Sequence, residues 1–239
     1  MFATRGFTTV SAVQKGMVLG VLLNLALVGY GVLRVPTIWT ASTGGPRSVA
    51  GALAILIIYG LIGLAGPAAT AGIDPRILPT ALRAGILAGS VFALEIVLEY
   101  AILPADNTTM GFVEFGTVFF IYLVAGVHIA TRTRRLRHAI LGAVWSAVIG
   151  SLIWYAAVLL ITYLFGGTSR QAAVFRAEGN YDDYRRSGMR DFNAFILEDF
   201  MGAGFFHLLL GPLIAAILGS IGGWIGKGLA LVRSHAGTP

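Results

Sequence analysis

The chain contains six runs of about twenty predominantly apolar residues, separated by short polar or Gly-Pro breaks. A bilayer has a hydrocarbon core about 30 Å thick, and a helix that rises about 1.5 Å per residue needs about 20 residues to cross it. The runs therefore predict an all-α, polytopic membrane helix bundle that forms a single transmembrane domain over residues 1–239. The expected crossings are residues 16–35, 49–65, 84–103, 110–130, 139–165 and 201–226.

Composition limits what such a chain can do. Apolar residues make up 56% of it and charged residues only 12%, about half the share in an ordinary soluble domain. Cysteine is absent, which excludes disulfides, thiolate zinc sites and iron–sulfur clusters, and we expect no cofactor. We interpret the net charge of +6 as Lys and Arg at the membrane surface. The expected partner is the lipid bilayer, with no nucleic acid, and a chain rich in Ala, Gly and Arg is typical of a bacterial cytoplasmic membrane.

The basic residues in the short loops predict the orientation of the bundle. Arg132, Arg134, Arg135 and Arg137 follow the fourth run, and cytoplasmic loops carry an excess of Lys and Arg. Six crossings with this turn inside place both termini in the cytoplasm. That side then carries Arg5, Lys15, Arg76, Arg83, the four arginines of this turn, Lys227 and Arg233, whereas the short outer loops carry only Arg34 and Arg47. The four arginines are also candidates for binding an anionic lipid headgroup, although such clusters more often only fix the topology.

Three carboxylates fall inside the expected crossings, where an ionised group costs about 3 kcal/mol or more. Glu95 and Glu99 are four residues apart and project from one face of the third helix, and Glu114 lies about a turn into the fourth. From the rise per residue, Glu99 lies about 6 Å, His207 about 9 Å and Glu95 about 12 Å below the outer surface. Carboxylate and imidazole groups at one depth can bind a divalent cation or pass a proton. These four residues are the candidate ion or proton site, and the candidate metal ligands if a metal is bound.

Each of these residues also has a structural interpretation. Glu99 and Glu114 can reach the outer headgroups or pair with Arg34 or Arg47, and His207 can be a packing residue. Glu95 has no Lys or Arg at its depth, so it is protonated, hydrogen-bonded to a polar neighbour, or in contact with water.

Two further patterns concern packing. Small residues repeat every four positions on several runs, among them Gly85 and Gly89, and Gly222 and Gly226, which allows close helix contact within the chain or in a homo-oligomer. The outer loop, residues 167–200, ends in a stripe of Phe192, Phe195 and Phe200, which predicts either an interfacial helix over residues 191–200 or an extension of the sixth crossing.

These features lead to three functional hypotheses. We favour a protein that moves or senses a small cation or proton, with Glu95 central and Glu99, Glu114 and His207 accessory. A membrane-embedded, metal-dependent enzyme would use the same side chains in a wide, water-filled cavity. A non-catalytic assembly protein would instead have mutually satisfied carboxyls and no cavity that reaches Glu95. The rotation of the helices distinguishes the first two hypotheses from the third.

Overall fold

The computed structural model describes residues 2–40, 44–102 and 108–236, and this part of the chain is helical, with no β-strand. Six of its helices are long and apolar enough to cross a membrane, which confirms the predicted all-α, multi-pass bundle. Residue 103, the expected end of the third crossing, lies outside the described residues. The helices are α1 (Phe2–Arg34), the 3₁₀ helix η1 (Pro36–Trp39), α2 (Gly45–Ile73), α3 (Ile77–Ile102), α4 (Thr108–Thr133), α5 (Leu136–Leu164), α6 (Ser169–Ala177), α7 (Asn180–Ser187) and α8 (Phe192–Ala236).

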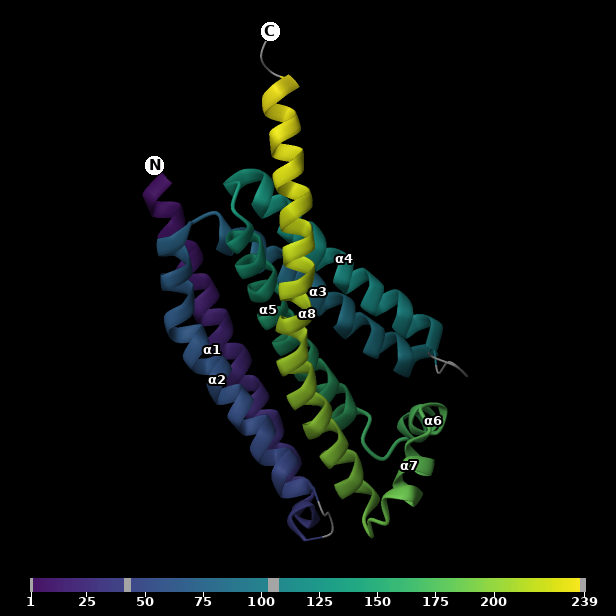
Figure 1. Cartoon of the computed structure of the whole chain (residues 1–239). Coiled ribbons are helices and arrows are strands. Elements are labelled where there is room, and N and C mark those ends of the chain that lie inside the picture. Colours follow the sequence, from purple (N-terminus) through teal and green to yellow (C-terminus); the bar gives the residue numbers. More distant parts are fainter. Residues whose placement is uncertain (1, 41–43, 103–107, 237–239) are drawn as a thin grey trace.

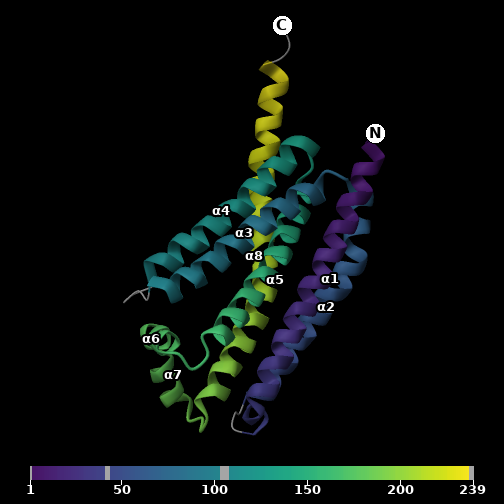
Figure 2. The same ribbon diagram turned by 180° about the vertical axis from the view of Figure 1, so that it is seen from behind.

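The bundle consists of two helical hairpins that lean apart, with α5 and α8 between them. The hairpin α1–α2 and the hairpin α3–α4 diverge from the central pair in both views (Figures 1 and 2). Helix α5 contacts α1, α3, α4 and α8. In its most apolar stretch 56% of the residues are buried, against 28 to 33% in the other five spans, so α5 is the central helix. The two ends of the described chain lie at the same end of the bundle (Figure 1).

Glycines allow α8 to approach α4 closely. A methyl group added at Gly222 would lie 2.3 Å from the carbonyl oxygen of Leu123, and one added at Gly226 would lie 2.5 Å from that of Val127. Both distances are far below van der Waals contact, so only glycine permits this backbone approach. These repeated glycines therefore pack helices of the same chain against one another.

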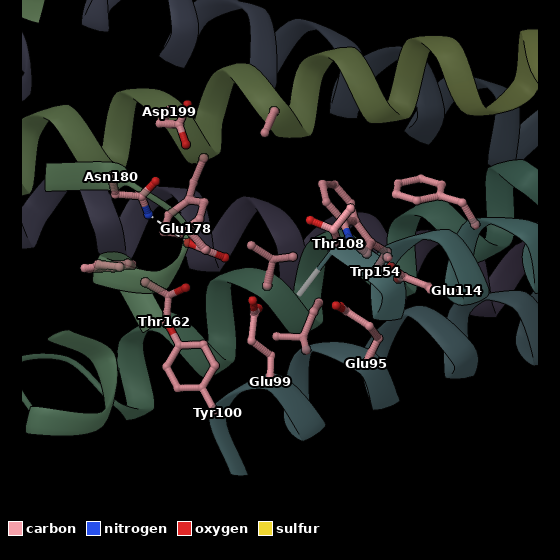
Figure 3. A pocket seen from close by; sticks show the side chains of 17 residues that line it. Glu95, Glu99, Tyr100, Thr108, Glu114, Trp154, Thr162, Glu178, Asn180 and Asp199 are labelled. Carbon is pink, nitrogen blue, oxygen red and sulfur yellow. Dashed lines mark hydrogen bonds between the residues drawn. The ribbon is translucent and has the colours of Figure 1, made fainter. Parts of the chain in front are cut away.

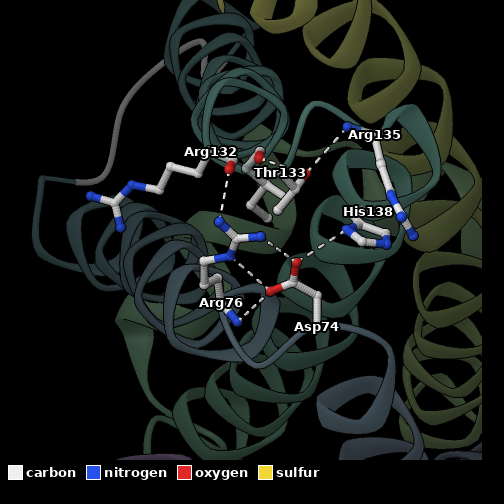
Figure 4. Close-up of polar contacts among 7 residues, drawn as sticks. Asp74, Arg76, Arg132, Thr133, Arg135 and His138 are labelled. Atoms are coloured by element: carbon white, nitrogen blue, oxygen red, sulfur yellow. Dashed lines mark hydrogen bonds and ion pairs between the residues drawn. The ribbon is translucent and has the colours of Figure 1, made fainter. Parts of the chain in front are cut away.

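Polar contacts around the Asp74–Arg76 ion pair join the turn between α2 and α3 to the end of α4 and the start of α5 (Figure 4). The Arg76 guanidinium donates to both carboxylate oxygens of Asp74, at 3.0 and 2.8 Å, and to the Arg132 carbonyl at 2.8 Å. The buried His138 ring lies 3.5 Å from the same carboxylate. Hydrogen bonds from Arg76 lower the pKa of Asp74, so this carboxyl stays ionised. The two turns are thereby held together at the end of the bundle that carries the basic residues.

Helix α8 continues through Pro212 without interruption. Proline has no N–H to donate to the carbonyl four residues earlier, which belongs to Leu208. The Tyr59 hydroxyl of α2 donates to that carbonyl at 2.6 Å instead. The proline thus creates an acceptor that ties α2 to α8, and the carbonyl is used in packing.

Candidate functional site

The loop between α5 and α8 folds back against the end of the α3–α4 hairpin as the two short helices α6 and α7 (Figures 1 and 2). Gly179 and Gly188 take positive φ angles of 78° and 69° at the two turns, a conformation that glycine adopts without strain. The Arg170 guanidinium donates to the carbonyls of Tyr100 and Ala101 at 2.8 and 3.0 Å, which fixes α6 to the last turn of α3.

Aromatic rings and a helix cap hold this loop against the start of α8. Phe192 forms ring pairs with Phe175 of α6 and with Tyr181 of α7, at 5.8 and 4.7 Å between centroids. Asp191 accepts hydrogen bonds from the backbone N–H groups of Asn193 and Ala194, at the first turn of α8. The segment of the predicted interfacial helix is thus the first part of α8, and Phe192 faces α6 and α7.

A cavity of about 500 Å³ lies where α3, α4, α5 and α8 meet the folded loop. Five of the eleven acidic residues of the chain line it, and none of its described lining residues is Lys, Arg or His. Figure 3 shows the side chains of Glu95 and Glu99 approaching the cavity from α3 and that of Asp199 approaching it from α8. The five acidic residues are Glu95, Glu99, Glu114, Glu178 and Asp199.

The carboxylates differ in burial, from an accessible rim to an enclosed interior. Glu178 and Asp199 are exposed, Glu95 is half-buried, and the side chains of Glu99 and Glu114 are buried, each with 7% of its surface exposed. One oxygen of Glu114, Oε1, is fully enclosed and has no hydrogen-bond partner among the described residues. A buried carboxylate oxygen without a partner is costly, so a cation, a proton or an ordered water is needed there.

The carboxyl of Glu178 at the rim is affected by the acidic groups near it. Although the Glu178 side chain reaches solvent, desolvation of its carboxyl by the surrounding chain, together with the nearby negative charge of Glu99, raises its pKa to about 8. The Asn180 amide donates to Glu178 at 2.8 Å and opposes this rise. Near neutral pH, the Glu178 carboxyl is therefore mainly protonated.

A second cavity, of about 270 Å³, continues from the acidic one toward the basic end of the bundle. Phe115, Trp154 and Ala203 line both cavities and form the wall between them. The second cavity is mainly apolar, and His207 lines it. The His207 ring stacks on Trp154, with 3.8 Å between centroids and 15° between planes.

The structure thus brings together three of the four residues of the predicted ion site. Glu95, Glu99 and Glu114 line one cavity, whereas His207 lines the next and faces aromatic rings. Among the described residues, no group of three or more Asp, Glu or His side chains is arranged to hold a metal ion. The carboxylates are therefore distributed around the cavity wall. Arg34 and Arg47, the partners considered for Glu99 and Glu114, do not line the cavity.

Sequence reasoning did not identify Glu178 and Asp199 as part of this site. Both lie in or near a loop of mixed charge, and their position depends on how that loop folds back. Local signals for the fold include the two glycines at the turns, Gly179 and Gly188, and the aromatic residues around them.

The candidate headgroup site lies at the opposite end of the bundle. Arg132, Arg134, Arg135 and Arg137 have exposed side chains at and beside the turn between α4 and α5. The Arg132 backbone carbonyl accepts a hydrogen bond from Arg76, and the Arg132 guanidinium lies on the surface.

The chain is a multi-pass helical membrane protein with an acidic cavity at the end of its bundle opposite this basic turn. No protein-family model, curated protein or solved structure matches the chain.

Proposed function

We propose that this protein binds a cation in the acidic cavity and transports it into the helix bundle. The observation that carries the proposal is the buried Glu114 oxygen that has no hydrogen-bond partner in the described part of the chain, in a cavity lined by four further carboxylic acids. Like charges around one cavity disfavour joint ionisation, so such a site takes up positive charge as a proton or as another cation. A cation at Glu114 would satisfy the oxygen and offset part of the negative charge of the neighbouring carboxylates.

The graded burial supports transport over simple surface binding. A cation can meet the exposed carboxylates of Glu178 and Asp199 first and then pass Glu95 to reach Glu114. An acidic cleft with low-dielectric walls also raises the local cation concentration. The second cavity, beyond Trp154, extends the path along the bundle.

The rival hypotheses fit this arrangement less well. An assembly protein would have no cavity at Glu95 and no unpartnered carboxylate, yet Glu95 lines the cavity and Glu114 keeps an unpartnered oxygen. A metal-dependent enzyme requires ligands that converge on one point, and the described side chains do not provide such a group.

Cation-driven charge movement in reconstituted vesicles tests the proposal. Wild-type protein should give a transient current when a cation is added on the side of α6 and α7, and Glu114→Gln should remove it while the protein remains folded. Asp182→Asn is the matched control, because Asp182 pairs with Arg185 on α7 and does not line the cavity. Equal currents from wild type and Glu114→Gln, across protons, Na⁺, Mg²⁺ and organic cations, would refute transport through this site.

A further inference from the structure

The cavity walls combine negative charge with aromatic surface. Besides the five carboxylic acids, its lining includes Tyr100, Phe115, Trp154, Phe175 and Phe200. Aromatic faces attract a cation within about 6 Å of the ring centroid, and they also bury apolar surface. A bare metal ion gains little from such walls, because it requires oxygen ligands at short, fixed distances.

The size of the cavity also favours an organic cation over a bare metal ion. A volume of about 500 Å³ falls within the range of pockets for small organic molecules, about 300 to 1,000 Å³. The described carboxylates do not converge as a coordination group. The site therefore fits a delocalised or bulky charge better than a compact one.

The second cavity adds room for the apolar part of such a molecule. It lies behind the wall of Phe115, Trp154 and Ala203, and is lined mainly by apolar and aromatic side chains, with His207 stacked on Trp154. A molecule with a charged group near Glu114 can place its apolar body against this wall. Rotation of the rings in the wall would join the two spaces.

We propose that the cargo is a hydrophobic organic cation, an ammonium or phosphonium with aromatic or aliphatic substituents, bound by Glu114 and the neighbouring carboxylates and stacked against Trp154 and Phe115. This inference rests on the proposed function and names its substrate class. The unpartnered Glu114 oxygen, 93% of whose residue surface is buried, supplies the charge recognition, and the aromatic wall selects against small, strongly hydrated ions.

The test uses two probes of the same shape and opposite charge. Tetraphenylphosphonium and tetraphenylborate are titrated into purified protein in detergent, with Na⁺ and Mg²⁺ in parallel, and binding is measured by calorimetry. We expect the phosphonium to bind and the borate not to bind. Glu114→Gln should weaken phosphonium binding about tenfold or more, since it removes the charge but keeps the shape. Trp154→Leu should weaken it about two- to thirtyfold through the lost cation–π contact.

Two further variants keep the result interpretable if a core substitution disturbs folding. Asp199→Asn and Glu178→Gln change exposed residues at the cavity rim and should weaken phosphonium binding, whereas Asp182→Asn should not. Equal binding of phosphonium and borate would show apolar partitioning and overturn the proposal. Binding of Na⁺ or Mg²⁺ alone, lost in Glu114→Gln, would overturn the organic-cation inference and leave the proposed function standing. If no cation binds, both fail.

Discussion

Individual carboxylates in the cavity differ in what surrounds them, and this difference sets their roles. Glu114 is buried, and one of its oxygens has no partner among residues 2–40, 44–102 and 108–236, so its environment favours a bound positive charge. Glu178 remains accessible to solvent, and its carboxyl accepts a hydrogen bond from the Asn180 amide. We assign ion recognition to the first residue and capture from solvent to the second.

Cation binding should depend on pH through Glu178. Its pKa is raised to about 8, so this carboxyl is mainly protonated below pH 8 and mainly ionised above it. Because only the ionised form attracts a cation, affinity should increase between pH 6 and pH 9, and binding should release protons. The groups around it are the carboxyls of Glu95, Glu99, Glu114 and Asp199, the Asn180 amide, and the hydroxyls of Tyr100, Thr108 and Thr162.

Titration calorimetry in buffers of different ionisation enthalpy measures this proton release. Glu178→Gln should reduce the increase in affinity between pH 6 and pH 9, whereas Asp182→Asn should leave it unchanged. A pH profile identical in wild type and Glu178→Gln would show that another group controls binding.

At the scale of secondary-structure elements, Asp191 fixes where α8 begins. Its carboxylate accepts hydrogen bonds from two N–H groups of the first turn and from the Thr37 hydroxyl of η1. These bonds lower the pKa of Asp191, and the Thr37 hydrogen bond is the largest cause. They therefore stabilise the fold at pH values above the ordinary pKa of an aspartate. This stabilisation is lost as the pH falls through the lowered pKa of Asp191. Loss of such a cap costs about 1 kcal/mol.

Asp191→Ala should therefore destabilise the protein by about 1 kcal/mol, whereas Asp191→Asn, which retains an acceptor oxygen, should cost less. Thermal unfolding in detergent, followed by circular dichroism at pH 7, measures both. Equal melting temperatures for wild type and Asp191→Ala would contradict the capping role.

The contact between α4 and α8 depends on glycine. Because a methyl group at Gly222 would lie 2.3 Å from a backbone carbonyl, Gly222→Ala must push the helices apart and should destabilise the protein by about 1 to 3 kcal/mol. Gly228→Ala on the same helix is the matched control, since a methyl group there meets nothing within 4 Å. Similar unfolding of both variants would mean that the two helices do not pack as closely as described.

Local sequence patterns predicted the features that are set within a single helix. The six spans follow from the length of the apolar runs, and the shared face of Glu95 and Glu99 follows from the helical repeat. The rotation of one helix against another does not follow from either, so His207, expected at the depth of the carboxylates, lines the neighbouring cavity. Asp199 joins the site only because α8 begins earlier than its apolar run indicates.

For the whole molecule, the basic turn and the acidic cavity lie at opposite ends of the bundle. The excess of Lys and Arg predicts that the basic end is cytoplasmic, so we expect the cavity to open on the other side. The cysteine-free chain allows a direct test with single cysteines at exposed positions. In intact cells, an impermeant thiol reagent should label Asp182→Cys and should not label Arg137→Cys. The reverse pattern would invert the orientation and the direction of cation entry.

The reactivity of the Glu114 carboxyl tests the cation site most directly. A hydrophobic carbodiimide modifies protonated carboxyls in apolar surroundings, and mass spectrometry of the protein in membranes locates the modified residue. The buried, unpartnered Glu114 should be modified, and a bound cation should slow the reaction, with tetraphenylphosphonium, Na⁺ and Mg²⁺ compared at equal ionic strength. If Glu114 is unreactive, or reacts at the same rate with and without each cation, the acidic cavity is not a cation site.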